Sequence, residues 1–232
     1  MSKPDHIVLL RHGQSIGNED KSLYANVPDF ALTLTKLGHR QAREAGKKLR
    51  KLFGPERVMF YISPFWRTRQ TFEEVAKSFP RIIAREDPRL REQEWGHLRS
   101  REATDFINQQ RDSYSSFYYR IVDGESVADV YDRCSSFLDT LFRDFEKPRF
   151  PRNAIIVSHG MLNRALLMRW LHYSVEQFEK LANPHNCEYY ILRLQSDGKY
   201  HLTEPPPQYD KVKHQYQYPG KVIAYPYIKG DR

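Results

Sequence analysis

Residues 7–18, IVLLRHGQSIGN, join a short apolar run to a polar turn. The apolar run is typical of a parallel strand that is covered on both faces. It ends abruptly in Arg11, His12 and Gly13, and Asn18 follows five residues after the glycine. Ligands of open parallel sheets bind beyond the carboxyl ends of the strands, so this ending predicts a binding site.

The composition indicates one domain with a basic surface. With 232 residues, of which 40% are hydrophobic, the chain can bury one good core but is short for two. The 37 Lys and Arg against 29 Asp and Glu give a formal net charge of +8. This charge suits a phosphorylated ligand, nucleic acid or an anionic membrane surface, or it is simply a solvated basic face.

The cysteine content and the N-terminal residues indicate in which cellular compartment the protein is expected. Cys134 and Cys187 form no CxxC pair, and a secreted disulfide scaffold of this length normally has more cysteines, which favours a reducing compartment. MSKPDH leads straight into the first apolar run without a signal-peptide core, and no run approaches the length of a membrane span. We therefore expect a cytoplasmic protein with no membrane partner.

Short strand patterns alternate with helical patterns along the chain. Strands are expected at 6–10, 57–62, 154–157 and 187–194, and amphipathic helices at 36–53 and 126–145. Ser63 with Pro64 resembles a helix N-cap, and SVEQ at 174–177 resembles a capping box. The alternation predicts an α/β fold, a three-layer α/β/α sandwich around a mostly parallel, doubly wound sheet.

Two segments depart from this alternation. Residues 97–123 are polar, rich in tyrosine and too long for a simple crossover, so we expect a helical insertion over the predicted site. The C-terminal residues include EPPPQYDKVKHQYQYPG, which is typical of an extension that leaves the core. The expected division is a main domain at 1–203, which contains the insertion, and a Pro- and Tyr-rich extension at 204–232.

Three of the predicted strands end in basic or imidazole side chains. Besides Arg11 and His12, Arg67 follows the second strand and His159 follows the third. Two guanidinium groups and two imidazoles at one sheet edge predict a cationic pocket, and a phosphoryl dianion best matches two guanidinium forks. Arg69 lies about 200° round its helix from Arg67, so we expect a structural role for it.

The chain lacks the usual parts of nucleotide-binding and serine-hydrolase sites, since it has no G-x-x-x-x-G-K-[ST], G-x-S-x-G or G-x-G-x-x-G motif. A neutral imidazole is a competent nucleophile at phosphorus, and neighbouring arginines both disfavour its protonation and neutralise phosphoryl charge. Metal ligation by His12 and His159 is the rival interpretation. Adjacent arginines oppose a divalent cation, and no H-x-x-x-H or H-x-H spacing occurs, so we expect no metal and no cofactor.

Five stretches of the chain form a recognisable series. They are LLRHGQSIGN (9–18), SPFWRTRQT (63–71), LREQEWG (90–96), GESVADVYDR (124–133) and IVSHG (156–160). In this order they resemble the signatures of the histidine phosphatase superfamily, in its phosphoglycerate-mutase-like branch, over residues 6 to about 195. The resemblance implies a three-layer α/β fold and a phosphohistidine intermediate on His12. The further phosphate-binding residues that it implies are Arg11, Arg67, His159, Asn18 and the Gly160 amide.

A general acid is expected in LREQEWG. The leaving oxygen of a phosphate ester needs a proton, and a carboxylic acid near it would supply one below neutral pH. The family register places the acid two residues after the leucine and four before the glycine, which selects Glu92 over Glu94.

Two stretches differ from phosphoglycerate mutases. Residues 19–34 lack a Gly-Trp segment, and the insertion lacks the basic run and the prolines that would hold a second phosphate and a sugar-acid carboxylate. Hydrolysis is therefore favoured over mutase activity. The chain looks most similar to the plant and fungal phosphoglycerate-mutase-like proteins, which include broad-range acid phosphatases. The third alternative is a catalytically idle basic scaffold that binds a partner, nucleic acid included. The retained catalytic residues argue against it, and no nucleic-acid-binding module is present.

The insertion is expected to set what the enzyme accepts, because the sheet edge binds only the phosphoryl group. Its aromatic and guanidinium side chains suit a ring or a second anion; they are Phe106, Arg111, Tyr114, Phe117, Tyr118, Tyr119 and Arg120. We expect Arg111 or Tyr114 to face the substrate, and Phe106 and Phe117 to point inward. The alternatives are that these aromatics only pack the insertion, or that 19–34 sets specificity. The expected partner is a small phosphomonoester, and the oligomeric state is left open.

Overall fold

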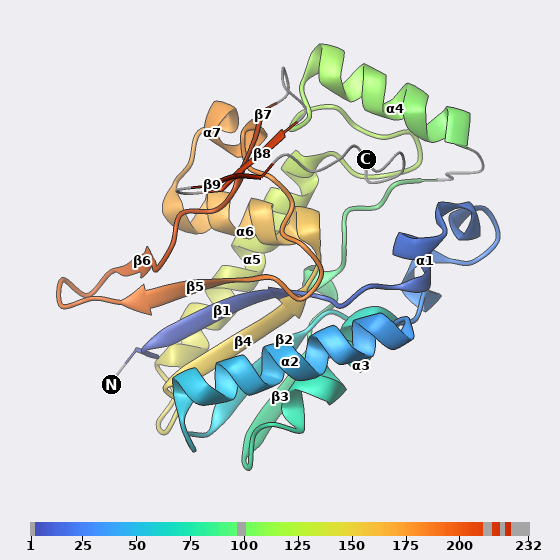
Figure 1. The fold of residues 1–232 in the computed structure, drawn as a ribbon. Helices are drawn as coiled ribbons and strands as arrows, with labels where there is room; N and C mark the ends of the chain where they lie inside the picture. The colour runs from blue at the N-terminus through green and yellow to red at the C-terminus, as the bar shows by residue number, and fades with distance from the viewer. Residues whose placement is uncertain (1–2, 97–100, 211–214, 219–220, 224–232) are drawn as a thin grey trace.

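A computed structural model describes residues 3–96, 101–210, 215–218 and 221–223. A six-stranded sheet lies between two layers of helices, in the strand order β3-β2-β4-β1-β5-β6 (Figure 1). The strands are β1 His6–Arg11, β2 Val58–Ile62, β3 Ile82–Glu86, β4 Asn153–Ser158, β5 Tyr189–Leu194 and β6 Tyr200–Leu202. The first four are parallel, and β5 and β6 run antiparallel to their neighbours. The predicted α/β fold with a mostly parallel sheet is confirmed.

Helices cover both faces of the sheet because its central strand is apolar on both sides. Val8 and Leu10 pack into the core under α2 and α3, whereas Ile7 and Leu9 pack into the core under α5 and α6. All four side chains are fully buried, as the alternation of side chains along a strand requires. The four helices are α2 Lys36–Phe53, α3 Trp66–Ala76, α5 Val127–Phe145 and α6 Gly160–Leu171.

The long helices begin and end at capping residues. The Thr35 side chain accepts a hydrogen bond from the Gly38 amide at the start of α2, and Gly54 ends that helix with a positive φ of 64°. Ser126 and Asp129 form a capping box at the start of α5. The helices expected at 36–53 and 126–145 are therefore confirmed, as is the capping box of Ser174 and Gln177 at α7, Val175–Glu179.

The structure differs from the sequence-based expectations at three places: one helix cap, one strand boundary and one strand that was not predicted. Ser63 does not cap a helix, because α3 starts at Trp66 after Phe65 and the Ser63 hydroxyl bonds to a histidine instead. The last predicted strand starts at Tyr189, because Cys187 has a left-handed backbone with φ of 57°. β3 was not predicted; it is an exposed edge strand without an alternating apolar pattern.

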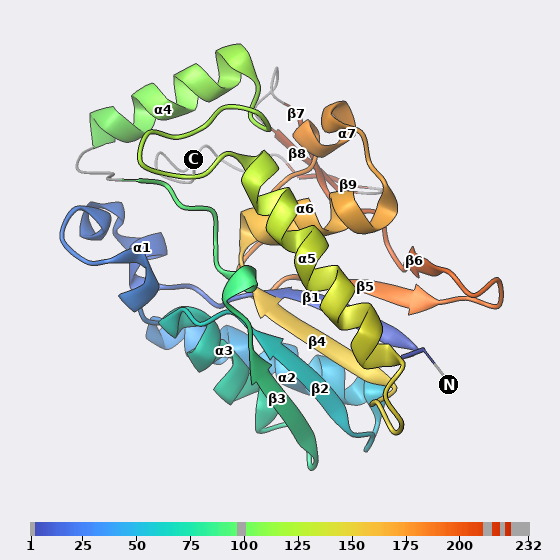
Figure 2. The same ribbon diagram turned by 180° about the vertical axis from the view of Figure 1, so that it is seen from behind.

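The remaining helical segments gather beyond the carboxyl ends of the parallel strands. They are α1 Ile16–Glu19, η1 Lys21–Ala25, η2 Asp29–Ala31, η3 Pro88–Leu90 and α4 Arg101–Tyr114. Both ribbon views place α1 and α4 on the side toward which the strands point (Figures 1 and 2). The insertion expected at 97–123 thus contains a helix at this end of the sheet, with 97–100 outside the described residues.

The C-terminal extension returns to the rest of the chain. Its described part forms a three-stranded sheet of β7 Gln208–Asp210, β8 Gln215–Tyr218 and β9 Lys221–Ile223. The Ala182 amide donates to the Pro207 carbonyl over 2.9 Å, and Pro206 and Pro207 are buried, so the first residues of the extension do not leave the core. Among the described helices, none has the length and apolarity needed to cross a membrane.

Candidate active site

Three neighbouring strands bring the predicted residues to one edge of the sheet. In the register, Arg11 of β1 pairs with Ser158 of β4, and Ile62 of β2 pairs with Val157. By the same register, Ser63 lies level with Ser158 and Arg11, and His12 and His159 emerge together one residue further along. The predicted convergence of the strand ends is confirmed, because parallel strands that are hydrogen-bonded in register end together.

His12 is held in the form that a nucleophile requires. Its Nδ1 lies 2.7 Å from the carbonyl oxygen of Gly13, and a carbonyl only accepts, so Nδ1 carries the proton and Nε2 keeps its lone pair. The side chain is 3% exposed. Burial lowers the pKa of His12 well below its usual value, and the charges of Arg67 and Arg11 lower it further. The imidazole is therefore neutral near pH 7.

His159 lies against His12, with ring centroids 5.2 Å apart. Its Nε2 is 2.8 Å from the Ser63 hydroxyl, and its buried Nδ1 has no hydrogen-bond partner among the described residues. Burial, then Arg67, lowers the pKa of His159, so this imidazole is neutral too. A buried polar atom without a partner is costly, and an oxygen of a bound phosphoryl group would satisfy it.

The two arginines of the pocket have different partners. Arg11 donates from Nη1 to the Pro184 carbonyl. Arg67 is 3% exposed, and its Nη1 and Nη2 bind the Asp29 carboxylate at 2.8 and 3.1 Å. The expected cationic pocket thus contains a carboxylate that the sequence did not reveal. Arg69 instead forms two 2.7 Å bonds to Glu86 on β3, so it does not join the pocket, in line with the structural role expected for it.

Asn18 is oriented by its neighbours so that its amide nitrogen is left for a ligand. Its Oδ1 accepts from the Ser15 amide and from Asn186 Nδ2, both at 3.1 Å. Asn186 Nδ2 also lies 3.2 Å from the His12 carbonyl, so this side chain fixes the catalytic loop. Sequence reasoning missed Asn186, because an asparagine in a polar loop is typical of any turn and only the fold places it beside His12.

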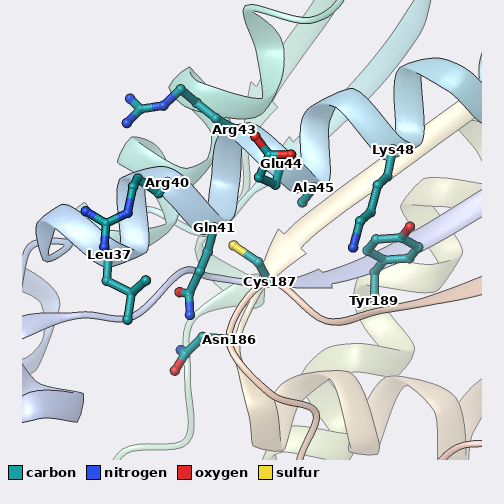
Figure 3. Close-up of a pocket in the computed structure, with 10 residues that line it drawn as sticks. All are labelled: Leu37, Arg40, Gln41, Arg43, Glu44, Ala45, Lys48, Asn186, Cys187 and Tyr189. Carbon is teal, nitrogen blue, oxygen red and sulfur yellow. The ribbon is translucent and has the colours of Figure 1, made fainter.

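Behind this loop lies a separate pocket of about 630 Å³ between α2 and the turn before β5 (Figure 3). Asn186 and Gln41 line it, and Gln41 Oε1 accepts from the Gln14 amide over 2.9 Å. None of the predicted catalytic side chains is among its described lining residues. This pocket therefore borders the support of the catalytic loop and not its reactive face.

Glu92 and Gly160 meet at the N-terminus of α6. The Glu92 carboxylate accepts from the Met161 and Leu162 amides at 3.3 and 3.2 Å. The Gly160 amide has no acceptor in the part of the chain that the structure describes. It precedes the two amides that hold Glu92, at the positive end of the helix dipole, so it can donate to an anion next to the carboxyl group.

The insertion residues lie differently from the prediction. Arg111 is buried, with its guanidinium 4.7 Å above the Trp95 ring, whereas Tyr114 is 74% exposed. In the described structure neither hydrogen-bonds to a strand-end residue, so their contact with substrate stays a prediction. Phe117 is buried as predicted. Phe106 is 59% exposed and not inward, because α4 buries the stripe that contains Arg111 and Phe106 lies off that stripe.

The described residues contain no cluster of three or more His, Cys, Asp or Glu side chains that could hold a metal ion. The described site instead contains two neutral imidazoles, two guanidinium groups and backbone amides, a donor set for an oxyanion.

A comparison with protein families finds that the histidine phosphatase superfamily (branch 1) matches residues 7–203. The chain belongs to this superfamily. Its relatives include the phosphoglycerate mutase-like protein AT74H of Arabidopsis thaliana, 42% identical over 85% of this chain and 76% of the relative. Another is the broad-range acid phosphatase DET1 of Saccharomyces cerevisiae, 25% identical over 90% of this chain and 91% of the relative.

Solved structures of other proteins show the same fold. A mycobacterial glucosyl-3-phosphoglycerate phosphatase superposes with a TM-score of 0.70, covering 88% of this chain and 99% of its own, at 23% identity. Membership confirms the resemblance drawn from the five motifs.

Proposed function

We propose that the protein hydrolyses phosphate monoesters through a phosphohistidine intermediate on Nε2 of His12. The observation that carries the proposal is the Nδ1 bond from His12 to the Gly13 carbonyl, which leaves Nε2 unprotonated beside His159, between two guanidinium groups. The relationship to acid phosphatases of yeast and Mycobacterium tuberculosis supports the same reaction.

In the first step, Nε2 of His12 attacks phosphorus and the ester P–O bond breaks. The electron pair of that bond leaves with the alcohol oxygen, which takes a proton from the Glu92 carboxyl group. Arg11, Arg67 and the Gly160 amide neutralise the charge on the phosphoryl oxygens during transfer.

In the second step, water attacks the phosphorus of phosphohistidine and the N–P bond breaks. Glu92, now a carboxylate, accepts a proton from this water, and inorganic phosphate leaves. His12 recovers its lone pair, and Glu92 recovers its proton, so the site is ready for another cycle. The Met161 and Leu162 amides hold Glu92 in place for both transfers.

The proposal includes a reducing, cytoplasmic compartment, which the two free cysteines support. Cys134 is buried and Cys187 is half-buried, and burial raises the pKa of each thiol to about 12. Both are therefore protonated and unreactive. Microscopy of the tagged full chain in its own cells, with an organelle-lumen signal as the contrary result, tests this assignment.

The reaction is tested with p-nitrophenyl phosphate and the His12→Ala variant. We expect wild-type protein to release inorganic phosphate, and the variant to lose activity by about 10³-fold or more with unchanged circular dichroism. His201→Ala, an exposed histidine on β6, is the control and should keep full activity. Conversion of 3-phosphoglycerate to its 2-isomer without phosphate release would instead identify a mutase, and unchanged activity in His12→Ala would refute the mechanism.

A further inference from the structure

Asp29 occupies one side of the Arg67 guanidinium group. Its backbone carbonyl and Oδ1 take both Nη1 protons at 2.6 and 2.8 Å, and Oδ2 takes an Nη2 proton at 3.1 Å. Phe65 lies against the face of the same group, with its ring centre 5.0 Å from Cζ. Arg67 is therefore fixed, and a phosphoryl group can reach it only through Nε and the remaining Nη2 proton.

Tyr24 shows that the segment containing Asp29 reaches the rest of the site. Its ring packs on Gly17, where an added Cβ would lie 3.0 Å from a ring carbon, one residue before Asn18. Burial raises the pKa of Tyr24 to about 12, and its phenol also senses Arg67, Asp29, Glu92 and Arg11. The phenol stays protonated at working pH, and it lies among the charged groups of the pocket.

The Asp29 carboxylate offsets part of the positive charge of the site before substrate enters. Arg11 and Arg67 are positive, Asp29 forms an ion pair with Arg67, and the two imidazoles are neutral. The positive potential that Arg67 presents to a substrate is therefore lower than it would be without Asp29. A substrate with a second negative group near the reacting phosphate meets the Asp29 carboxylate, and like charges brought together cost binding free energy.

We propose that Asp29 is a specificity residue, which selects phosphate monoesters whose leaving group carries no second negative charge. The inference rests on the proposed function and names its substrate class. A negative charge placed against an unwanted partner discriminates as effectively as a new contact to the wanted one. The carboxylate also holds the Arg67 guanidinium in place. Asp29 therefore affects both the net charge of the pocket and the position of Arg67.

The test compares two substrates of the same carbon skeleton, glycerol 3-phosphate and 3-phosphoglycerate, which differ in a hydroxymethyl group against a carboxylate. We measure the ratio of their kcat/KM values in wild-type protein, in Asp29→Asn and in Asp20→Asn. Asparagine retains oxygen and shape beside Arg67 but removes the charge. We expect Asp29→Asn to shift the ratio toward 3-phosphoglycerate by about tenfold.

Asp20→Asn is the matched control. It removes one carboxylate from the same segment, where the Asp20 side chain caps η1 through the Ser22 amide, away from Arg67, and asparagine is an equally good cap. Its ratio should equal that of wild type. An Asp29→Asn ratio that equals the Asp20→Asn ratio would overturn the inference.

A measurement on wild-type protein keeps the test independent of how the variant folds. We expect glycerol 3-phosphate to be preferred, and the preference to narrow as ionic strength rises, because salt screens the repulsion. A preference for 3-phosphoglycerate would contradict the role of Asp29 as a specificity residue. A preference for glycerol 3-phosphate that salt leaves unchanged would contradict it too, because the discrimination would then not depend on charge. Loss of His12-dependent hydrolysis of both substrates would instead refute the proposed function, so the two failures are distinguishable.

Discussion

The strand ends and the segment at 20–31 contribute to the same site in different ways. Arg11, His12 and His159 are placed by the register of β1 and β4, where backbone hydrogen bonds leave no freedom. Tyr24 and Asp29 come from short 3₁₀ helices joined by irregular chain, and they reach the site through side-chain contacts. The sheet therefore positions the residues that carry out the reaction. Substitutions in the irregular segment can change the preference for leaving groups without moving those residues.

The largest effect is expected in Glu92→Gln, which alters the chemical step at the strand ends and leaves the segment at 20–31 unchanged. We expect kcat/KM for glycerol 3-phosphate to fall by about 100-fold or more, because an alkoxide needs a proton to leave. The loss for p-nitrophenyl phosphate should be less than about tenfold, since nitrophenolate leaves unprotonated. Steady-state kinetics with both substrates measure the difference.

The control for this experiment is Glu94→Gln, the exposed neighbour whose amide bonds to Glu125. It should change neither substrate by more than about twofold, as expected for a surface position. Equal losses for both substrates in Glu92→Gln would mean that Glu92 only holds the start of α6 and donates no proton.

A smaller effect is expected from the support of the catalytic loop. Asn186→Ala removes the bonds to the His12 carbonyl and to Asn18 Oδ1, so both groups lose their fixed positions. We expect kcat to fall by about tenfold, with a smaller change in KM. Asn26→Ala, at an exposed position, is the control. A normal kcat in Asn186→Ala would show that the strand register alone positions His12.

The pH dependence of the reaction tests whether the charges of Arg67 and Arg11 lower the pKa of His12. The pKa of His12 is lowered by burial and by two positive neighbours, and the neutral form is the nucleophile. The acid limb of kcat/KM should therefore lie below pH 6.5, after correction for substrate ionisation. Arg11→Gln removes one positive neighbour, so the His12 pKa rises and the limb moves to higher pH. Arg40→Gln, in the pocket behind the loop, should leave it in place, and a limb that moves to lower pH in Arg11→Gln would contradict the assignment.

The smallest effects are expected in the insertion. Arg111 stacks on Trp95 in a buried position, so Arg111→Ala should lower the free energy of unfolding by about 1 kcal/mol. Tyr114→Ala, at an exposed position, should change it by less than about 0.5 kcal/mol. Urea titrations measure both. If Tyr114→Ala altered the selectivity between a bulky and a small substrate by about tenfold, α4 would share the specificity role assigned to Asp29.

The part of this site that the sequence predicts is the part that local pattern controls. An apolar run that stops at Arg11 and His12 marks the end of a strand, and the same signal occurs before His159. Parallel register then brings these residues together without further information. The helices at 36–53 and 126–145 were equally predictable, because their apolar spacing and their caps agree.

What the sequence did not reveal depends on contacts between distant segments. Asp29 and Arg67 are 38 residues apart, and Asn186 and His12 are 174 apart, so no local pattern links either pair. Ser63 was misassigned as a helix cap because its local sequence fits a cap, while its hydroxyl is committed to His159 across the sheet edge. Side chains that serve a site often break the local rule in this way.

The most direct test of the mechanism is to find the phosphoryl group on the enzyme. Glu92→Gln treated with p-nitrophenyl phosphate should form the intermediate normally, because this leaving group needs no acid, and should hydrolyse it slowly, because the base for water is missing. Rapid trapping at alkaline pH followed by peptide mass spectrometry should place one phosphoryl group on His12. A phosphoryl group on His159 or Ser63, or turnover without any phosphoenzyme, would contradict the account.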